Sequence, residues 1–230
     1  MPDLKTKLSG KFIVFDGPDG SGKGTQLQLL AESLTGSGAQ VVRAKDPGGT
    51  PIGDRIRSVL LDFDLSTMDV RCETFLFMAS RAQLISEVIE PALKASKVVL
   101  CDRFISSTCA YQGAAGYDPQ RIIELGRLAV GNTWPQLTII LDVPPEEGFR
   151  RTGRKPHHAG QKRKDMGEGL FSDALPDAME ARPLDFHRKV HKLFMSLPKD
   201  YPGRVEVVSG LGSNAEVHQR ILELLERVDF

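Results

Sequence analysis

The glycine-rich stretch from Lys11 to Thr25 constrains the fold of this chain more than any other feature. It reads KFIVFDGPDGSGKGT, and residues 11–16 have the β-branched and aromatic composition of a buried strand. A helical pattern that includes Leu27 and Leu30 follows the glycines. A strand, a glycine-rich turn, a lysine and a helix in this order are typical of a P-loop, in which backbone N–H groups at a helix start surround phosphate. The alternative is a glycine-rich connection that binds nothing, and the strand and helix argue against it.

The loop itself predicts a nucleotide-phosphate site. We expect its residues to contact the phosphates of a nucleotide donor, with the lysine reaching the outer ones: Gly17, Pro18, Asp19, Gly20, Ser21, Gly22, Lys23, Gly24 and Thr25. The residue after the lysine is Gly24, where a Ser or Thr usually contacts Mg²⁺, and the hydroxyl follows one residue later at Thr25. This Gly-Lys-Gly-Thr variant is more similar to nucleoside-monophosphate kinases, adenylate kinases among them, than to GTPases or motor ATPases.

The composition excludes several classes of partner. The chain has 230 residues, enough for one α/β domain with a sizeable core, although the length also allows two small ones. Thirty basic and thirty acidic residues cancel, so there is no electrostatic case for a nucleic acid polymer or an anionic membrane. No apolar run approaches the roughly 18 residues of a membrane span, and three cysteines without zinc-ligand spacing fit a reducing compartment. We expect a cytoplasmic protein.

The order of elements predicts an α/β P-loop NTPase fold with three layers. Apolar strand patterns recur at 11–16, 39–44, 97–101, 137–141 and 204–208, with helical patterns between them, the longest over 70–94. This alternation predicts a single domain over residues 1–230, with five parallel strands and helices on both faces. Asp102 directly follows the third strand, as the carboxylate of a Walker B motif does; the alternative is that it only caps the strand end.

A basic stretch from Arg150 to Lys164 interrupts a helical pattern. Gly153, Pro156 and Gly160 make a continuous rigid helix there unfavourable. We expect a lid over about 150–176 that closes on the phosphates. Its best candidates for a catalytic arginine are Arg151 and Arg154, and the alternative is a solvated basic loop.

Six motifs in this order resemble bacterial thymidylate kinases, which transfer the γ-phosphate of ATP to dTMP. They are Asp19-Gly-Ser-Gly-Lys23, Asp46-Pro-Gly-Gly-Thr50, Phe77-Met-Ala-Ser-Arg81, Asp102-Arg-Phe with Ala110-Tyr-Gln-Gly113, Leu141-Asp-Val-Pro-Pro145 and Leu184-Asp-Phe-His-Arg-Lys-Val190. The chain departs from the family at Gly24, at Lys45 where Arg is usual, at Phe104 where Tyr or His is common, and over a lengthened stretch from 155 to 182.

The resemblance implies a role for each charged residue around the phosphates. Lys23 would hold the outer phosphates of the donor, and Arg103 would bind the acceptor phosphate through its planar guanidinium. Asp102 would associate with Mg²⁺, directly or through water. Asp19 would face the 3′-hydroxyl of the acceptor sugar or a water on Mg²⁺.

The resemblance also implies an acceptor site for a deoxypyrimidine. Phe77 would stack on the base, Arg81, one helical turn later, would bond its edge, and Tyr111 would pack under the deoxyribose. Further acceptor contacts would come from Thr108, Gln112 and Lys45. Outside this pattern, Phe77 and Arg81 would more often be a core residue and a solvated charge, and the alternative for Thr108, Tyr111 and Gln112 is ordinary helix packing.

The function implied is a thymidylate kinase that converts MgATP and dTMP to ADP and dTDP for dTTP synthesis, acting as a homodimer. Two alternatives remain at this stage. One is a kinase of another nucleoside monophosphate. The other is a P-loop nucleotide-binding regulator, in which Gly24 and the altered lid mark lost catalysis. Retention of Lys23, Asp102 and Arg103 together argues against the regulator.

Overall fold

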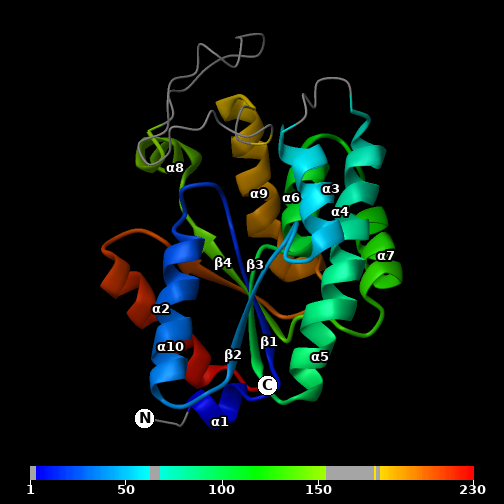
Figure 1. Cartoon of the computed structure of the whole chain (residues 1–230). Coiled ribbons are helices and arrows are strands. Elements are labelled where there is room, and N and C mark those ends of the chain that lie inside the picture. Colours follow the sequence, from blue (N-terminus) through cyan, green and yellow to red (C-terminus); the bar gives the residue numbers. More distant parts are fainter. Residues whose placement is uncertain (1–3, 63–67, 154–178, 180–181) are drawn as a thin grey trace.

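Five parallel strands form one sheet with the order β2-β3-β1-β4-β5 (Figure 1). The computed structural model describes residues 4–62, 68–153, 179 and 182–230. The strands are β1 (Phe12–Asp16), β2 (Val41–Lys45), β3 (Val98–Asp102), β4 (Leu137–Asp142) and β5 (Val205–Ser209). The predicted sheet is confirmed, with strand boundaries shifted by one or two residues. The central β1 carries the P-loop, so the loop lies in the middle of the sheet edge.

Helices cover both faces of the sheet (Figure 1). One face carries α1 (Leu4–Leu8), α2 (Lys23–Gly36) and α10 (Asn214–Arg227). The other side holds α3 (Pro51–Asp62), α4 (Val70–Leu84), the π-helical η2 (Ile85–Ile89), α5 (Glu90–Lys94), α6 (Ile105–Ala114), α7 (Pro119–Val130) and α9 (Leu184–Asp200). Alternation along β1 divides the core: Ile13 and Phe15 pack on the α2 side, and Phe12 and Val14 on the α6 side. The predicted three layers follow.

Local sequence sets where the helices begin. Thr50 accepts a hydrogen bond from the N–H of Gly53 at 3.0 Å, immediately before the helix-starting Pro51. Asp118 caps α7 in the same way. The helix predicted over 70–94 is present, with a π turn at Ile85–Ile89 directly before Pro91, which lacks the N–H needed for a regular helical bond. The short helix α1 was not predicted.

The carboxyl ends of the strands meet at one edge of the sheet, and α8 (Pro145–Arg151) lies at that edge after β4 (Figure 1). The P-loop follows β1 with Gly17 at a φ of 133°, and an added Cβ there would lie 2.6 Å from the carbonyl oxygen of Leu141. Glycine is therefore required where the loop turns beside β4. None of the helices in the described part of the chain is both long and apolar enough to cross a membrane.

Candidate active site

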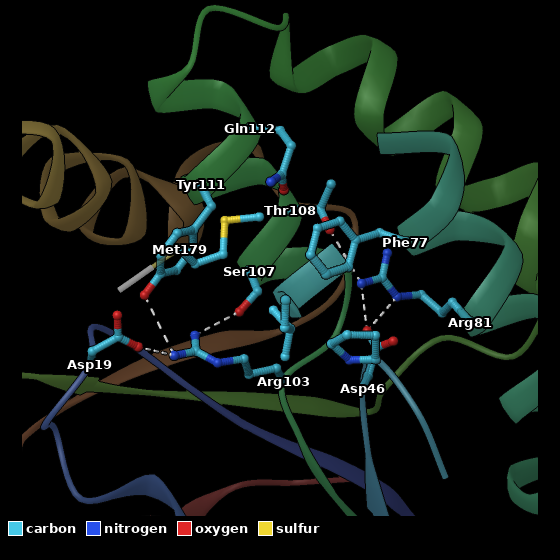
Figure 2. A pocket seen from close by; sticks show the side chains of 12 residues that line it. Asp19, Asp46, Phe77, Arg81, Arg103, Ser107, Thr108, Tyr111, Gln112 and Met179 are labelled. Carbon is cyan, nitrogen blue, oxygen red and sulfur yellow. Dashed lines mark hydrogen bonds and ion pairs between the residues drawn. The ribbon is translucent and has the colours of Figure 1, made fainter. Parts of the chain in front are cut away.

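Two hollows at the carboxyl edge of the sheet lie on either side of the P-loop. The first encloses about 480 Å³, open mouth included, and is lined by Asp19, Asp46, Pro47, Leu61, Phe77, Arg81, Arg103, Ser107, Thr108, Tyr111, Gln112 and Met179 (Figure 2). We call it the acceptor pocket. The second encloses about 1090 Å³ between the P-loop, α8 and the loop after β5. We call it the donor hollow.

A buried ion pair forms one wall of the acceptor pocket (Figure 2). Arg81 donates from Nε to Oδ2 of Asp46 at 2.7 Å and from Nη2 to Oγ1 of Thr108 at 3.2 Å. The side chains of Arg81 and Asp46 are 1% and 0% exposed. Burial raises the pKa of Asp46, and the charge of Arg81 opposes that shift. The pair thus joins the end of β2, α4 and α6 into one rigid frame beside Phe77.

Asp16, at the end of β1, holds the acceptor pocket against the P-loop. Its buried carboxylate accepts hydrogen bonds from the hydroxyls of Ser106 and Ser107, both at 2.6 Å, and from the N–H of Gly17 at 2.9 Å. These three donors satisfy the hydrogen-bonding capacity of a carboxylate that is shielded from water. It therefore fixes the start of α6 to the P-loop.

Arg103 lies between the acceptor pocket and the P-loop. Its φ of 69° places a non-glycine residue in the left-handed region, directly after β3. The guanidinium contacts Asp19, donates to Ser107 at 3.0 Å and to the carbonyl of Gly17 at 3.2 Å, and lies 5.2 Å from the Tyr111 ring centroid (Figure 2). A strained backbone held by this many contacts is typical of a functional site. The guanidinium is consequently fixed at the boundary where a phosphoryl group would pass.

The P-loop lysine is folded into its own loop. Nζ of Lys23 donates to the carbonyls of Gly17 and Pro18, at 3.1 and 2.9 Å, and contacts Oγ of Ser21 at 3.4 Å. Burial lowers the pKa of Lys23 to about 8, and the positive charge of Arg103 adds to the effect. The ammonium therefore gains from a neighbouring anion, and phosphate is the anion that this loop admits.

Helix α8 approaches the P-loop more closely than side chains would allow. An added Cβ at Gly20 would collide with the backbone of Gly148, because the two glycines face each other. Arg151, from the same helix, donates to the carbonyl of Gly210 at 3.1 Å and reaches that of Gly20 at 3.4 Å. Of the two predicted lid arginines, Arg151 thus lies at the donor hollow, and Arg154 is outside the described residues, as is most of the predicted lid.

Asp102 and Lys45 line a third depression beside the P-loop, together with Gly24. Oδ1 of Asp102 is buried and accepts no hydrogen bond from the residues that the structure describes. An unbonded carboxylate oxygen near the phosphate loop suits Mg²⁺, which needs only one or two protein carboxylates beside phosphates and water. No cluster of three or more acidic, histidine or cysteine side chains that could hold a metal occurs among the described residues. The donor set therefore fits a nucleotide-borne Mg²⁺.

Most of the predicted acceptor residues meet in one place. Asp19, Phe77, Arg81, Arg103, Thr108, Tyr111 and Gln112 all line the acceptor pocket. Lys45 does not, since its exposed side chain belongs to the third depression. Asp19, predicted for both substrates, turns toward the acceptor pocket (Figure 2).

Six residues of the site were missed by sequence reasoning: Asp16, Asp46, Pro47, Leu61, Ser107 and Met179. A signal existed for the two aspartates, because Asp16 ends β1 and Asp46 directly follows β2, at the edge where ligands bind. No signal in the sequence pointed to Met179, because it lies in the stretch from 155 to 182 that departs from the family pattern.

A P-loop in a five-stranded parallel sheet, with a pocket of arginine and aromatic side chains beside it, defines a P-loop kinase of a small phosphorylated acceptor. A sequence model of thymidylate kinase matches residues 15–221. Thymidylate kinases of Protochlamydia amoebophila and Geotalea uraniireducens are 40% and 41% identical, over 96% and 87% of this chain and 94% and 89% of theirs. The thymidylate kinase structure from Ehrlichia chaffeensis superposes with a TM-score of 0.70 at 31% identity, covering 95% of this chain and 99% of that one. The chain belongs to the thymidylate kinase family and is a nucleoside-monophosphate kinase.

Proposed function

We propose that the acceptor pocket binds dTMP and that the γ-phosphate of ATP is transferred to it across Arg103, giving dTDP and ADP. The observation that carries this is the position of Arg103 between the acceptor pocket and the P-loop, in contact with Asp19 and the carbonyl of Gly17. The base would lie against Phe77, with its edge toward Arg81 and Thr108, which the pair with Asp46 holds in place. The acceptor phosphate would then meet the guanidinium of Arg103.

Phosphoryl transfer requires positioning and charge neutralisation more than covalent chemistry. Lys23 would leave the carbonyls of Gly17 and Pro18 for the outer phosphates of the donor and, with Arg103, neutralise charge on the group in transit. Arg151 would support the donor phosphates from α8, since it already reaches the carbonyl of Gly20. Tyr111, beside Arg103, would pack under the deoxyribose.

Mg²⁺ would be held by the donor phosphates, with Asp102 and the hydroxyl of Thr25 as the protein groups nearest to them, directly or through water. When bound, it would supply further neutralisation of phosphate charge. The absence of a hydroxyl after Lys23, at Gly24, assigns a larger share of this task to Asp102.

We also propose a homodimer in the cytoplasm. Large apolar side chains are exposed on three neighbouring helices: Ile52 and Val59 on α3, Phe75 on α4 and Leu128 on α7. Such side chains are favourable at an interface between copies. Cys72, Cys101 and Cys109 are free thiols, as in a reducing compartment. Light scattering during gel filtration would give the mass, and 25.3 kDa would contradict the dimer.

An ADP-release assay tests the function directly. The purified chain is given MgATP with dTMP, dUMP, dCMP, AMP or GMP in turn. We expect dTMP to be the best acceptor, and AMP and GMP to be nearly inert. Comparable turnover of AMP would contradict the assignment of the pocket to a pyrimidine.

A further inference from the structure

An ion pair outside the acceptor pocket connects α4 to the chain just before α9. One guanidinium nitrogen of Arg182 lies 3.0 and 3.3 Å from the two carboxylate oxygens of Glu73. The side chain of Glu73 is 3% exposed and that of Arg182 is 19% exposed. A pair this sheltered is costly to break, because it leaves a charge without a partner.

The same arginine is tied to the pocket wall. The backbone N–H of Arg182 donates to the carbonyl of Met179 at 3.3 Å, and its guanidinium lies 4.6 Å from the centroid of the Phe186 ring. Met179 is 8% exposed and lines the acceptor pocket, with its thioether pointing inward (Figure 2). Phe186 in turn packs against Tyr111, with ring centroids 6.4 Å apart. A shift of Arg182 would therefore move two sides of the pocket.

The carboxylate of Glu73 depends on Arg182 in its buried position. Burial raises the pKa of Glu73, and the positive charge of Arg182 opposes this shift. Glu73 thus holds the guanidinium of the residue whose backbone N–H bonds the carbonyl of Met179.

We propose that the Glu73–Arg182 ion pair positions the wall against which the acceptor base lies, because it holds Met179 in place. Neither member of the pair lines the pocket, so both act through Met179 and through the packing of Phe186 on Tyr111. The role concerns acceptor affinity and the discrimination of thymine from uracil, since an apolar wall senses a methyl group. We expect no direct part in phosphoryl transfer, because the contacts that the structure gives Glu73 and Arg182 include neither Lys23 nor Arg103. The inference rests on the proposed function and names further determinants of the same site.

Steady-state kinetics of the full chain test this with Arg182→Ala, Arg182→Lys, Met179→Ala and the double variant Arg182→Ala with Met179→Ala. We expect Arg182→Ala to raise KM for dTMP about tenfold and to lower the preference for dTMP over dUMP, with kcat and KM for ATP within about twofold of wild type. Arg182→Lys should restore most of the affinity. In the double variant the increase in KM should be clearly smaller than the product of the single effects, because both changes loosen one wall.

Arg188→Ala is the matched control. Arg188 lies on the first turns of α9 and pairs with Glu146 and Asp185, but it does not line the pocket. Its loss should leave both KM values unchanged. All variants are assayed below the onset of their thermal unfolding, and Glu73→Gln provides a second way to break the pair should Arg182→Ala fold poorly.

Two results would overturn the inference: an unchanged KM for dTMP in folded Arg182→Ala and Glu73→Gln, or an equal rise in the KM values for dTMP and ATP. Failure of the wild type to phosphorylate dTMP would instead contradict the proposed function. The same variants would then be compared on whichever monophosphate the wild type uses, and an unchanged KM there would still overturn the positioning role.

Discussion

The acceptor pocket and the donor hollow share the P-loop but are built differently. In the acceptor pocket, the charged side chains are paired with one another: Asp46 and Arg81 are 0% and 1% exposed, and Asp19 and Arg103 are 12% and 22% exposed. In the donor hollow, the charged side chains belong to α8 and are open to solvent, as with Arg150 and its partner Glu147, at 73% and 25% exposure. One site is part of the folded core, and the other lies at its surface.

This difference separates selectivity from chemistry. A frame built on a buried ion pair cannot rearrange cheaply, so we expect the acceptor pocket to select its ligand by shape. The donor hollow offers backbone N–H groups and solvent-exposed charges, which suit any nucleoside triphosphate and can adjust when it binds. Changes in the acceptor frame should therefore affect folding and acceptor selectivity together, and changes at the donor side should affect turnover and ATP affinity while leaving acceptor selectivity unchanged.

The largest effect should come from Arg81→Leu. It leaves Asp46 buried without its partner, and breaking a buried pair costs about 3–5 kcal/mol of folding free energy. Urea denaturation measures this loss, and dTMP binding should disappear with it. Arg71→Leu on the same helix is the control, because its pair with Asp69 is exposed and should be dispensable. Equal stability of the two variants would show that the acceptor frame is not part of the core.

Next in size are Lys23→Ala and Arg103→Lys, which test the boundary between the two sites. Each removes a preorganised charge from the transferring group, and the loss should be about 3 kcal/mol in kcat/KM, or two to three orders of magnitude. The lysine at position 103 keeps the charge but loses the planar contacts to Asp19, Gly17 and Ser107. Thermal stability should change little in Lys23→Ala. Near-normal kcat/KM in either variant would contradict the proposed transfer path.

Arg151→Ala should lower kcat about a hundredfold and leave the affinity for dTMP unchanged, because its contacts lie on the donor side, at the carbonyls of Gly20 and Gly210. Arg150→Ala is the neighbouring control, since that arginine is exposed and paired only with Glu147 among the described residues. A hundredfold loss in kcat for Arg150→Ala as well would mean that general charge on α8 matters more than the contact of Arg151. A loss of dTMP affinity in Arg151→Ala would contradict the idea that the donor hollow and the acceptor pocket act independently.

The sequence predicts some parts of the fold and of the acceptor pocket better than others, and the reasons are physical. The P-loop, the five parallel strands and most residues that line the acceptor pocket could be predicted, because strand periodicity and short motifs are local signals. The pairing of Asp46 with Arg81 could not, since it joins residues 35 apart whose meeting depends on how α4 packs over β2. For the same reason Arg81 was predicted as a base contact, while its role as a frame element appeared only in the fold.

The placement of Lys45 shows the same limit. The resemblance put it in the acceptor site, and its register opposite Asp102 on β3 turns it toward the third depression. Side chains alternate between the faces of a strand, so a position one residue before Asp46 points the other way. The motif Asp46-Pro-Gly-Gly-Thr50 can be recognised from the sequence alone. The direction in which the preceding residue, Lys45, points depends instead on how β2 pairs with β3.

A smaller effect should separate dTMP from dUMP. The pocket is lined by Phe77, Leu61 and Met179, and one methyl group in such a wall changes kcat/KM by about 10- to 200-fold. The donor side should show no comparable selectivity, so GTP should replace ATP with less loss than dUMP replaces dTMP. Competition assays with paired substrates measure both ratios. Greater selectivity for the donor than for the acceptor would contradict the expectation that the acceptor pocket is the more selective site.

The smallest expected effect is the pH dependence of ligand affinity, which we expect for ATP and not for dTMP. The pKa of Lys23 is lowered to about 8 by burial, with a contribution from Arg103. Donor phosphates beside the amine favour its charged form and raise its pKa in the complex. Below pH 8 the amine is charged in both states, and affinity for ATP is constant. As the pH rises through 8, the free protein loses the proton that the complex keeps, so affinity should fall by up to about tenfold per pH unit.

Affinity for the acceptor dTMP should not share this pH dependence. A phosphate monoester has its second pKa near 6, so dTMP carries its full charge above pH 8, and the guanidinium of Arg103 stays protonated throughout. Affinity for dTMP should therefore be flat between pH 8 and 9.5. Calorimetry of a non-hydrolysable ATP analogue at pH 9, in two buffers of different ionisation enthalpy, should report proton uptake in wild type and none in Lys23→Arg, whose side chain cannot lose its charge. Equal pH slopes for the two ligands, or the same slope in Lys23→Arg, would show that Lys23 does not titrate on binding and that the donor hollow is as preorganised as the acceptor pocket.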